Sequence, residues 1–419
     1  MTPARPTARI LSTTALAVAG TAASLFLTAV PASAAVTSTQ YADQAFPATL
    51  TSPTADKPQS KVWRAGNRWW AVMVPAGRGR PTIHQLMPDH TWRDTGVLVD
   101  AGAAAAADAA AASRPDSTAD VLGLGNMAHV VSRTATGEIR YERFQYIGVG
   151  NVWLRLPGAA RVLATGGTES ASLTRDSTGT LWVTFTQGKR VMVTRTVSPG
   201  SGDWTPATVL PVPDATVSSD DISAITRFRG RVGIMWSDQQ SSAVRFAVHD
   251  DGTPDTRWTV QTVLSGAGVA DDHISLKGTF DDDRVFAAVK TSLDDDPASP
   301  ATAPLIQVLR RDAAGRWTVS TSHTIADKAT RPQIVVDFVN GRVHVLTTSP
   351  VAGGTVYRKD ASASTLAWTA GRGTVLMSAA GAVVNDVSTT KDPVDGDGIV
   401  AIASDNTAHR YRHAEIATS

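Results

Sequence analysis

The stretch that decides the fold is residues 169–210, ESASLTRDSTGTLWVTFTQGKRVMVTRTVSPGSGDWTPATVL. Runs rich in Val, Thr, Leu and aromatic residues alternate here with turns rich in Gly, Asp and Ser, which is the pattern of short antiparallel strands. The predicted strands are 170–175, 180–186, 190–197 and 204–210. A single four-stranded sheet cannot bury both of its faces, so we expect the unit to repeat.

Tryptophan marks the repeat. It recurs at Trp92, Trp153, Trp204, Trp258, Trp317 and Trp368, at intervals of 51 to 61 residues. Seven unit starts keep the same period, near residues 60, 119, 169, 220, 271, 331 and 385. This pattern predicts an all-β fold, a β-propeller of seven four-stranded blades. Six or eight blades, or two β-sandwich domains with accidental tryptophan spacing, are the alternatives.

The seventh unit lacks an outer strand, because the sequence stops at Ser419 soon after its third strand-like run. We expect a strand within 36–50 to fill this place and to remove an exposed sheet edge. The predicted organisation is a leader at 1–34, an N-terminal segment with the closing strand at 35–58, and a propeller at 59–419.

The first 34 residues have the pattern of a secretory signal peptide. Arg5 and Arg9 precede an apolar run at 10–30, and Ala32-Ser33-Ala34 supplies small residues for cleavage. The alternative is an uncleaved membrane anchor. The pattern predicts a secreted, extracellular protein, which we expect to be a monomer.

Composition narrows the classes of partner. Cleavage would leave two fewer than the 39 basic residues, against 38 acidic ones. A nearly neutral chain argues against nucleic acid or an anionic membrane as a partner. The sequence has no cysteine, which excludes disulfides and thiolate-bound metals.

Three stretches interrupt the repeat. Residues 101–113 are an alanine-rich run, which we interpret as a loop between blades, and residues 293–303 are an insertion inside the fifth unit. Residues 392–398 space their aspartates in a way that suggests a calcium ion near Asp395 and Asp397, but the later bidentate glutamate is missing. We therefore predict no cofactor and no metal site.

Four units resemble the sialidase-like propellers grouped under BNR repeats. The stretches that carry the resemblance are 169–188 (ESASLTRDSTGTLWVTFTQG), 220–239 (DDISAITRFRGRVGIMWSDQ), 271–292 (DDHISLKGTFDDDRVFAAVKTS) and 331–359 (RPQIVVDFVNGRVHVLTTSPVAGGTVYRK). The chain is more similar still to a group of secreted actinobacterial propellers. The resemblance implies the fold more firmly than the activity, because propellers host lectins, hydrolases, lyases and scaffolds.

The chain departs from true sialidases at their functional residues. Their Asp-box reads roughly Ser-x-Asp-x-Gly-x-Thr-Trp, and the nearest match, from Asp176 to Trp182, does not fit it. True sialidases also hold the substrate carboxylate with three arginines and use a tyrosine nucleophile. Here Arg331 alone opens a unit as an arginine, and no tyrosine opens one. The departures argue against cleavage of sialic acid.

The unit starts should converge at one mouth of the axial channel, because the innermost strands of a propeller line its axis. The residues expected there to bind substrate are Lys61, Asp120, Glu169, Arg331, Asp386 and Lys391. Asp272, His273 and Asp221 are the candidate catalytic residues. Crowded carboxylates divide acid and base roles as glycoside hydrolysis requires, and a histidine beside them can serve as the base of a lyase.

Two functions follow from this ring. One is a glycoside hydrolase or polysaccharide lyase that acts on a glycan or polysaccharide at the axial mouth. The other is a non-catalytic lectin-like or protein-interaction propeller that uses the same mouth. The alternative to both is that these polar groups only cap strand ends and bind channel water.

Overall fold

The strands form seven antiparallel sheets in a computed structural model that describes Met1 and residues 36–418, except 56, 58, 79, 100–117, 135, 159, 280, 395 and 397. Residues 36–419 cluster as one unit. The predicted leader, the alanine-rich run and the aspartates of the suggested calcium loop, Asp395 and Asp397, lie outside the described residues. Within the described part, no helix is long and apolar enough to cross a membrane.

In the first six blades the strands pair in chain order, apart from the two outer strands of blade 2. Blade 1 contains β2 (Val62–Ala65), β3 (Arg68–Met73), β4 (Thr82–Leu86) and β5 (Trp92–Leu98). Blade 2 contains β6 (Asp120–Leu124), β7 (Met127–Arg133), β8 (Ile139–Ile147), β9 (Val152–Arg155) and β10 (Arg161–Ala164). Blade 3 contains β11 (Ser172–Arg175), β12 (Leu181–Gln187), β13 (Arg190–Arg195) and β14 (Thr208–Val209).

The second half of the chain repeats this plan. Blade 4 contains β15 (Ser223–Phe228), β16 (Arg231–Asp238), β17 (Ala243–Asp250) and β18 (Thr259–Ser265). Blade 5 contains β19 (Ile274–Thr279), β20 (Asp282–Lys290), β21 (Pro304–Arg311) and β22 (Trp317–Thr324), with short 3-10 helices η2 (Leu293–Asp295) and η3 (Ile325–Asp327). Blade 6 contains β23 (Thr330–Asp337), β24 (Arg342–Ser349), β25 (Thr355–Ser362) and β26 (Thr374–Met377).

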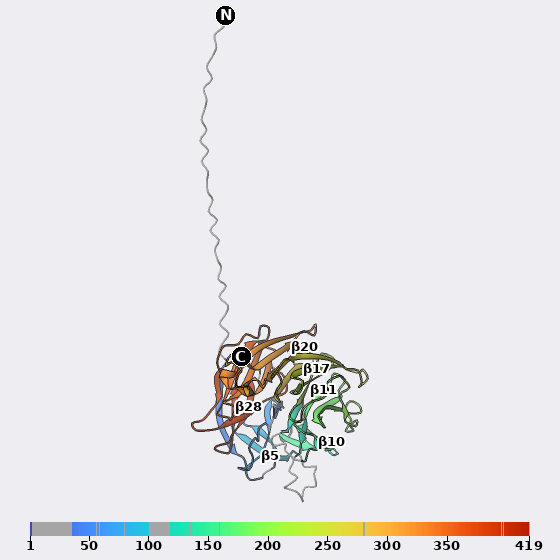
Figure 1. Ribbon diagram of the computed structural model, residues 1–419. Helices are drawn as coiled ribbons and strands as arrows, with labels where there is room; N and C mark the ends of the chain where they lie inside the picture. Colours follow the sequence, from blue (N-terminus) through green and yellow to red (C-terminus); the bar gives the residue numbers. More distant parts are fainter. Residues whose placement is uncertain are drawn as a thin grey trace. The chain divides into compact units, whose positions relative to one another are not determined.

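Blade 7 joins the two ends of the described chain. Its inner strands are β27 (Val384–Ser388), β28 (Ile399–Asp405) and β29 (Arg410–Ile416), and β1 (Ser38–Ala45) pairs antiparallel with β29 as the outermost strand. The register places Tyr41 opposite His413. The predicted closure by an N-terminal strand is confirmed, and in Figure 1 the blue and red ends of the colour scale meet at this blade.

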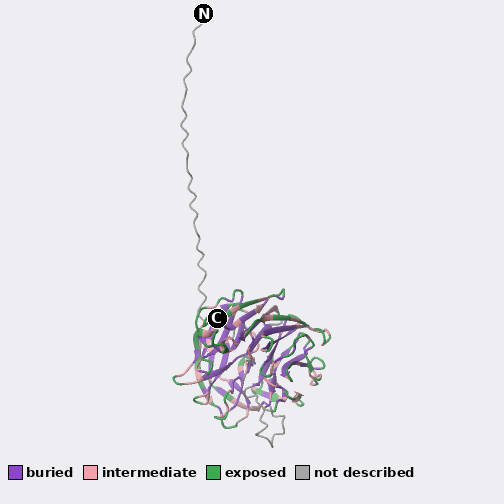
Figure 2. Ribbon diagram, in the orientation of Figure 1, coloured by how far each residue is buried: buried purple, intermediate pink, exposed green. Residues whose placement is uncertain are grey.

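The hydrophobic core is divided among the blade interfaces. Seven buried clusters are found among the described residues, and each draws on two neighbouring blades. Between blades 1 and 2, the ring of Trp153 packs edge-on against Trp63 and Trp70, at centroid distances of 5.7 and 5.5 Å. Burial of one such side chain contributes on the order of 1.5–3 kcal/mol. Figure 2 shows buried residues along the strands and exposed ones at the loops.

Two details differ from the sequence-based expectation. Blade 2 has five strands, because β9 and β10 both pair with β8. In blade 3 the outer strand is only β14, and Trp204 forms an isolated bridge with Thr196 instead of opening a strand at 204–210. The proline and glycine residues between 199 and 206 explain the late start, since they interrupt regular ladder pairing.

Candidate functional site

The inner strands β2, β6, β11, β15, β19, β23 and β27 line the propeller axis, each in contact with the next. They define two faces. The strand-start face is where these strands begin, and the hairpin face is where they turn into the second strand of each blade. The candidate residues named from the sequence lie at or just inside the strand-start face, except Lys391, which follows β27 and lies deeper in the channel.

Three residues of the N-terminal segment, Thr54, Lys57 and Gln59, make contacts at the strand-start face. The hydroxyl of Thr54 donates to the carbonyl of Asp386 (2.5 Å), and Lys57 forms an ion pair with Asp272. Deeper in the channel, the carbonyl of Gln59 accepts hydrogen bonds from Gln333 Nε2 (3.1 Å) and Ser388 Oγ (2.8 Å). The cavity left beside Lys57 has a volume of only about 20 Å³.

Asp120 and Lys391 are brought together inside the channel. Asp120 is 2% exposed and accepts hydrogen bonds from the backbone of Ser60 (3.1 Å) and Leu173 (2.9 Å) as well as from the Lys391 ammonium. Every oxygen of this carboxylate therefore has a protein partner. The geometry is that of a link between blades 1, 2, 3 and 7.

A second channel lysine, Lys277, was not singled out from the sequence. Its Nζ donates to Ser60 Oγ (3.0 Å) and to the carbonyl of Thr390 (2.8 Å). Burial, together with the positive charge of Lys391, lowers the pKa of Lys277 to about 7 against the opposing effect of Asp120 and Asp392. Its position in the middle of the apolar β19 run gave no signal of this role.

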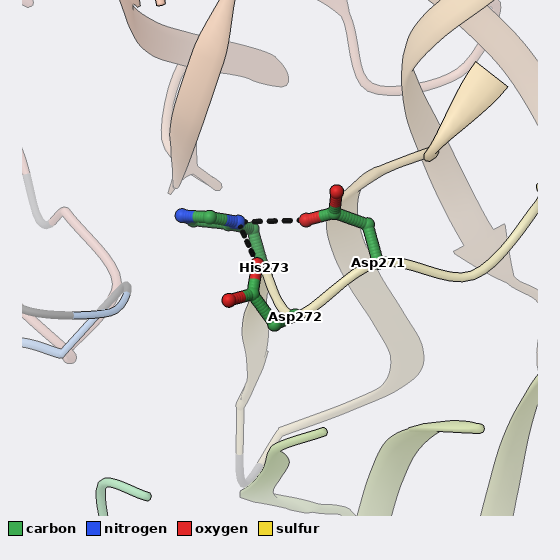
Figure 3. Close-up of side chains that lie close together, drawn as sticks. All are labelled: Asp271, Asp272 and His273. Atoms are coloured by element: carbon green, nitrogen blue, oxygen red, sulfur yellow. Dashed lines mark hydrogen bonds and ion pairs between the residues drawn. The ribbon is translucent and has the colours of Figure 1, made fainter. Parts of the chain in front are cut away.

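Asp271, Asp272 and His273 form the densest group of titratable side chains, just before β19 (Figure 3). His273 Nδ1 lies 2.7 Å from Asp271 Oδ1 and 2.5 Å from Asp272 Oδ1. Figure 3 shows the other ring nitrogen, Nε2, on the edge that faces away from both carboxylates. Nε2 is buried and has no hydrogen-bond partner among the described residues. Because both neighbours of Nδ1 are acceptors, a neutral ring carries its proton on Nδ1 and keeps Nε2 as the acceptor.

Cations surround this cluster. Lys57 pairs with Asp272, and Lys290 lies 2.7 Å from Asp271 Oδ2 and 3.0 Å from Asp294 Oδ1. Burial by itself raises the pKa of Asp271, but hydrogen bonds and charge from His273 and Lys290 outweigh it and lower that pKa to about 2. The three side chains also form a donor set for a metal ion, but the two lysines already supply positive charge to the carboxylates.

The pKa of His273 is lowered. Burial is the main cause, and the positive charges of Lys57 and Arg331 act in the same direction against the opposing effect of Asp271. His273 is therefore neutral at pH 7, with a lone pair on Nε2.

Arg331 and Asp386 meet at the same face. Arg331 Nε lies 2.8 Å from Asp386 Oδ1, and the Asp386 side chain is fully buried. Both residues have positive φ, 51° and 56°, and both lie where the pairing register of their strand shifts. Left-handed backbone at such residues is costly and persists only where the surroundings hold it.

The other three candidates are Asp221, Lys61 and Glu169. Asp221 is fully buried, and its carboxylate accepts from the backbone of Ser218 (2.6 Å) and Gln239 (3.2 Å). Its bonding is that of a loop cap. Lys61 is fully buried and its Nζ donates to the carbonyl of Pro53 (3.4 Å). Glu169 is half-buried in the loop before β11.

Comparisons with known proteins show that the fold of this chain is similar to that of solved structures. No protein-family model and no curated protein matches the chain. A solved polysaccharide lyase of family PL25, an ulvan lyase, is similar with a TM-score of 0.53 at 10% identity, over 89% of this chain and 95% of that one. The same coverage and identity hold for an ulvan lyase bound to -[GlcA(1-4)Rha3S]-, with a TM-score of 0.51.

An N10 neuraminidase-like protein of a virus from the little yellow-shouldered bat is also similar, with a TM-score of 0.45 at 10% identity, over 73% of this chain and 95% of that one. These identities concern the fold alone.

Proposed function

We propose that this protein is a carbohydrate-active propeller that cleaves an acidic polysaccharide at the strand-start face, with His273 as the general base. The observation that carries the proposal is the orientation of the His273 imidazole. Its Nδ1 is held by Asp271 and Asp272, while its Nε2 is unpartnered among the described residues. A neutral histidine oriented in this way can remove a proton.

The reaction that suits such a base is β-elimination next to a uronate. His273 Nε2 takes the proton on C5 of the uronate, a double bond forms between C4 and C5, and the C4–O4 bond breaks with its electron pair on the leaving oxygen. The leaving oxygen takes up a proton, for which the Lys57 ammonium is the nearest candidate donor. The products are an unsaturated uronate end and a new reducing end.

Positive charge near the base supports an acidic substrate. Lys57 and Arg331 both act on the His273 charge. A cation paired with the uronate carboxylate stabilises the negative charge that develops when C5 loses its proton. Arg331 is suited to this because a guanidinium can bind a carboxylate through two parallel hydrogen bonds. The fold likeness to ulvan lyases, one of them bound to a glucuronate-containing chain, is consistent with this class of substrate.

A second function, non-catalytic glycan binding, is favoured by one specific observation. His273 is only 8% exposed, its Nε2 is buried, and the cavity beside Lys57 is about 20 Å³, so a sugar reaches Nε2 only if neighbouring side chains move. A binder needs no such access. In either case we propose that the protein acts outside the cell, as the pattern of its first 34 residues implies.

The deciding experiment is a panel of acidic and neutral polysaccharides, with binding and the ultraviolet absorbance of unsaturated uronate ends read side by side. We expect release of such ends from an acidic polysaccharide, with His273→Gln slower by about 10²–10⁴-fold. Activity should rise with pH through the lowered pKa of His273 and then level off, because only the neutral ring accepts the proton.

The matched control is His344→Gln, since His344 is also buried and has its Nδ1 2.7 Å from a carboxylate, Asp360, in blade 6. Full activity of His273→Gln would contradict the proposed base. Binding without any product would favour the lectin-like alternative. Neither binding nor release on the whole panel would contradict both functions.

A further inference from the structure

Three arginines of blades 2 and 3 gather around one loop of blade 3, which connects β13 to β14. Arg175 ends the inner strand β11, Arg143 lies in β8 and Arg161 begins β10. A Cβ atom at Gly202, in the β13–β14 loop, would lie 3.7 Å from Arg143 Nη2 and 4.0 Å from Arg161 Nη2. The two guanidiniums of blade 2 therefore approach the loop at the same residue, and the glycine leaves the space beside them without a side chain.

Arg175 belongs to the same group. A Cβ atom at Gly179 would lie 3.0 Å from Arg175 Nη2 and 3.3 Å from the Cβ atom of Pro199, which is part of the β13–β14 loop. The positive charges of Arg175 and Arg143 also both act on His129 in β7. Burial lowers the pKa of His129 to about 4, and these two charges act in the same direction. All three guanidiniums therefore lie close to this loop.

The described residues supply little negative charge to this group. Neither Arg143 nor Arg175 forms an ion pair with any of them, and Arg143 Nε is buried without a hydrogen-bond partner among them. Arg161 donates to the carbonyl of Gly158 (2.6 Å), and the Asp203 carboxylate, which is 80% exposed, lies 3.8 Å from its Nη2. Like charges held close together repel one another, so an oxyanion bound among the three arginines would be attracted by all of them.

Contacts with blade 2 fix the β13–β14 loop. The Trp204 indole packs edge-on against Tyr141, with ring centroids 4.8 Å apart, and the Tyr141 hydroxyl lies 2.7 Å from His129 Nδ1. Within the loop, the backbone N–H of Val197 donates to the carbonyl of Asp203 (2.9 Å). A loop that is already held in this way loses little conformational entropy when a ligand binds.

We propose that Arg143, Arg161 and Arg175 form a binding site for a sulfate or carboxylate group of an acidic polysaccharide. A planar guanidinium can donate two parallel hydrogen bonds to either oxyanion. The site is separate from the candidate base, because Arg175 lies at the end of β11 that turns into β12, whereas His273 precedes the start of β19. That the oxyanion belongs to a polysaccharide rests on the proposed function, whereas the clustering of the arginines does not.

The test measures binding by calorimetry on the protein carrying His273→Gln, so that no probe is consumed. The probes are a κ-carrageenan tetrasaccharide, which carries sulfate, a galacturonate tetrasaccharide, which carries carboxylate, maltotetraose, which is neutral, and inorganic sulfate. We expect Arg143→Gln and Arg175→Gln each to weaken binding of an acidic tetrasaccharide at least about tenfold, which is the size of one lost charge-assisted hydrogen bond. Arg229→Gln is the matched control, because it removes one positive charge that already has a carboxylate partner, Asp283, at 3.5 Å.

Gly202 allows a test of opposite sign. Its φ lies outside the left-handed region, so a side chain can be placed there without backbone strain. Gly202→Asp brings a carboxylate to Arg143 and Arg161, so it should weaken binding at least as much as Arg143→Gln and should raise the midpoint of thermal unfolding. Gly202→Asn has the same shape without the charge and should leave the midpoint near that of the parent protein. A midpoint no higher in Gly202→Asp than in Gly202→Asn would contradict the uncompensated charge.

The outcomes separate this site from the proposed reaction. If no polysaccharide is cleaved but the arginine variants still weaken binding, the site stands and the reaction fails. If inorganic sulfate binds but neither acidic tetrasaccharide does, the assignment to a polysaccharide is wrong. Absence of binding by every anionic probe, or binding unchanged in both Arg143→Gln and Arg175→Gln, would overturn the site itself.

Discussion

The strand-start face and the hairpin face of this propeller divide the properties of a binding site between them. The strand-start face holds the concentrated titratable groups, from Asp271 and His273 to the Arg331–Asp386 pair, but Thr54, Lys57 and Gln59 make contacts there. The hairpin face has open volume around Trp69. The difference teaches that clustered ionisable groups and accessible space are separate criteria, and that each face meets one of them.

The largest expected effect tests whether the channel charges are structural. Asp120→Asn removes the negative partner of the Lys391 ammonium, which stays buried. We expect the free energy of unfolding to fall by about 3–5 kcal/mol, as for other buried ion pairs that lose one member. Chemical denaturation measures it.

The control is Asp220→Asn at an exposed carboxylate of the same face, with an expected change within about 0.5 kcal/mol. If Asp120→Asn left stability unchanged and abolished glycan binding instead, Asp120 would belong to a binding site and the contrast between the faces would weaken.

A second effect separates acid inactivation at His273 from acid unfolding. The pKa of both His129 and His323 is lowered to about 4 by burial, with nearby positive charges adding to it. As pH falls below the unfolded value of about 6.5, the unfolded chain takes up protons first, so stability is lost down to about pH 4. Over that range each histidine should lower the free energy of unfolding by about 3 kcal/mol. Unfolding curves at both pH values measure the loss.

In His129→Gln the free energy of unfolding should depend less on pH, because the contribution of one histidine is removed. Stability that does not change between pH 6.5 and 4 would contradict the buried neutral state of these rings. Activity at the strand-start face should be compared only where the protein remains folded.

The smallest effect concerns Lys57, whose positive charge acts on His273. Lys57→Met removes a positive charge that helps to lower the pKa of His273, so that pKa should rise. Because Lys57 is also the candidate proton donor, the plateau activity should fall, while the acid limb of the remaining activity should move to higher pH by less than about one unit. An unmoved limb would show that Lys57 does not act on His273.

The fold was predictable because its signals are local and repeated. Turn residues, β-rich runs and the tryptophan period placed seven blades, and the missing outer strand pointed to closure by a segment before blade 1. The insertion at 293–303 also lies where it was expected, between β20 and β21. Trp204 was placed wrongly in a strand, since local composition does not reveal where pairing stops.

The site was predictable only in part. Unit starts indicated that Asp120, Arg331 and Asp386 lie near the axis, but their partners come from across the ring. Lys57 and Lys290 were missed because neither opens a unit. One signal was available for Lys57: the segment 51–60 directly precedes the first inner strand, so it has to approach the axis at the strand-start face as every other connection does.

The pairing of β1 with β29 also has a consequence for how the molecule is made. Arg410 of β29 donates to the carbonyl of Asp43 in β1, 367 residues away along the chain. The first described strand therefore pairs with the last described one, and the ring cannot close before both strands are present. Contacts of such long sequence separation form slowly. Until then blade 7 exposes an unpaired edge, which is the stage at which this protein is most open to aggregation.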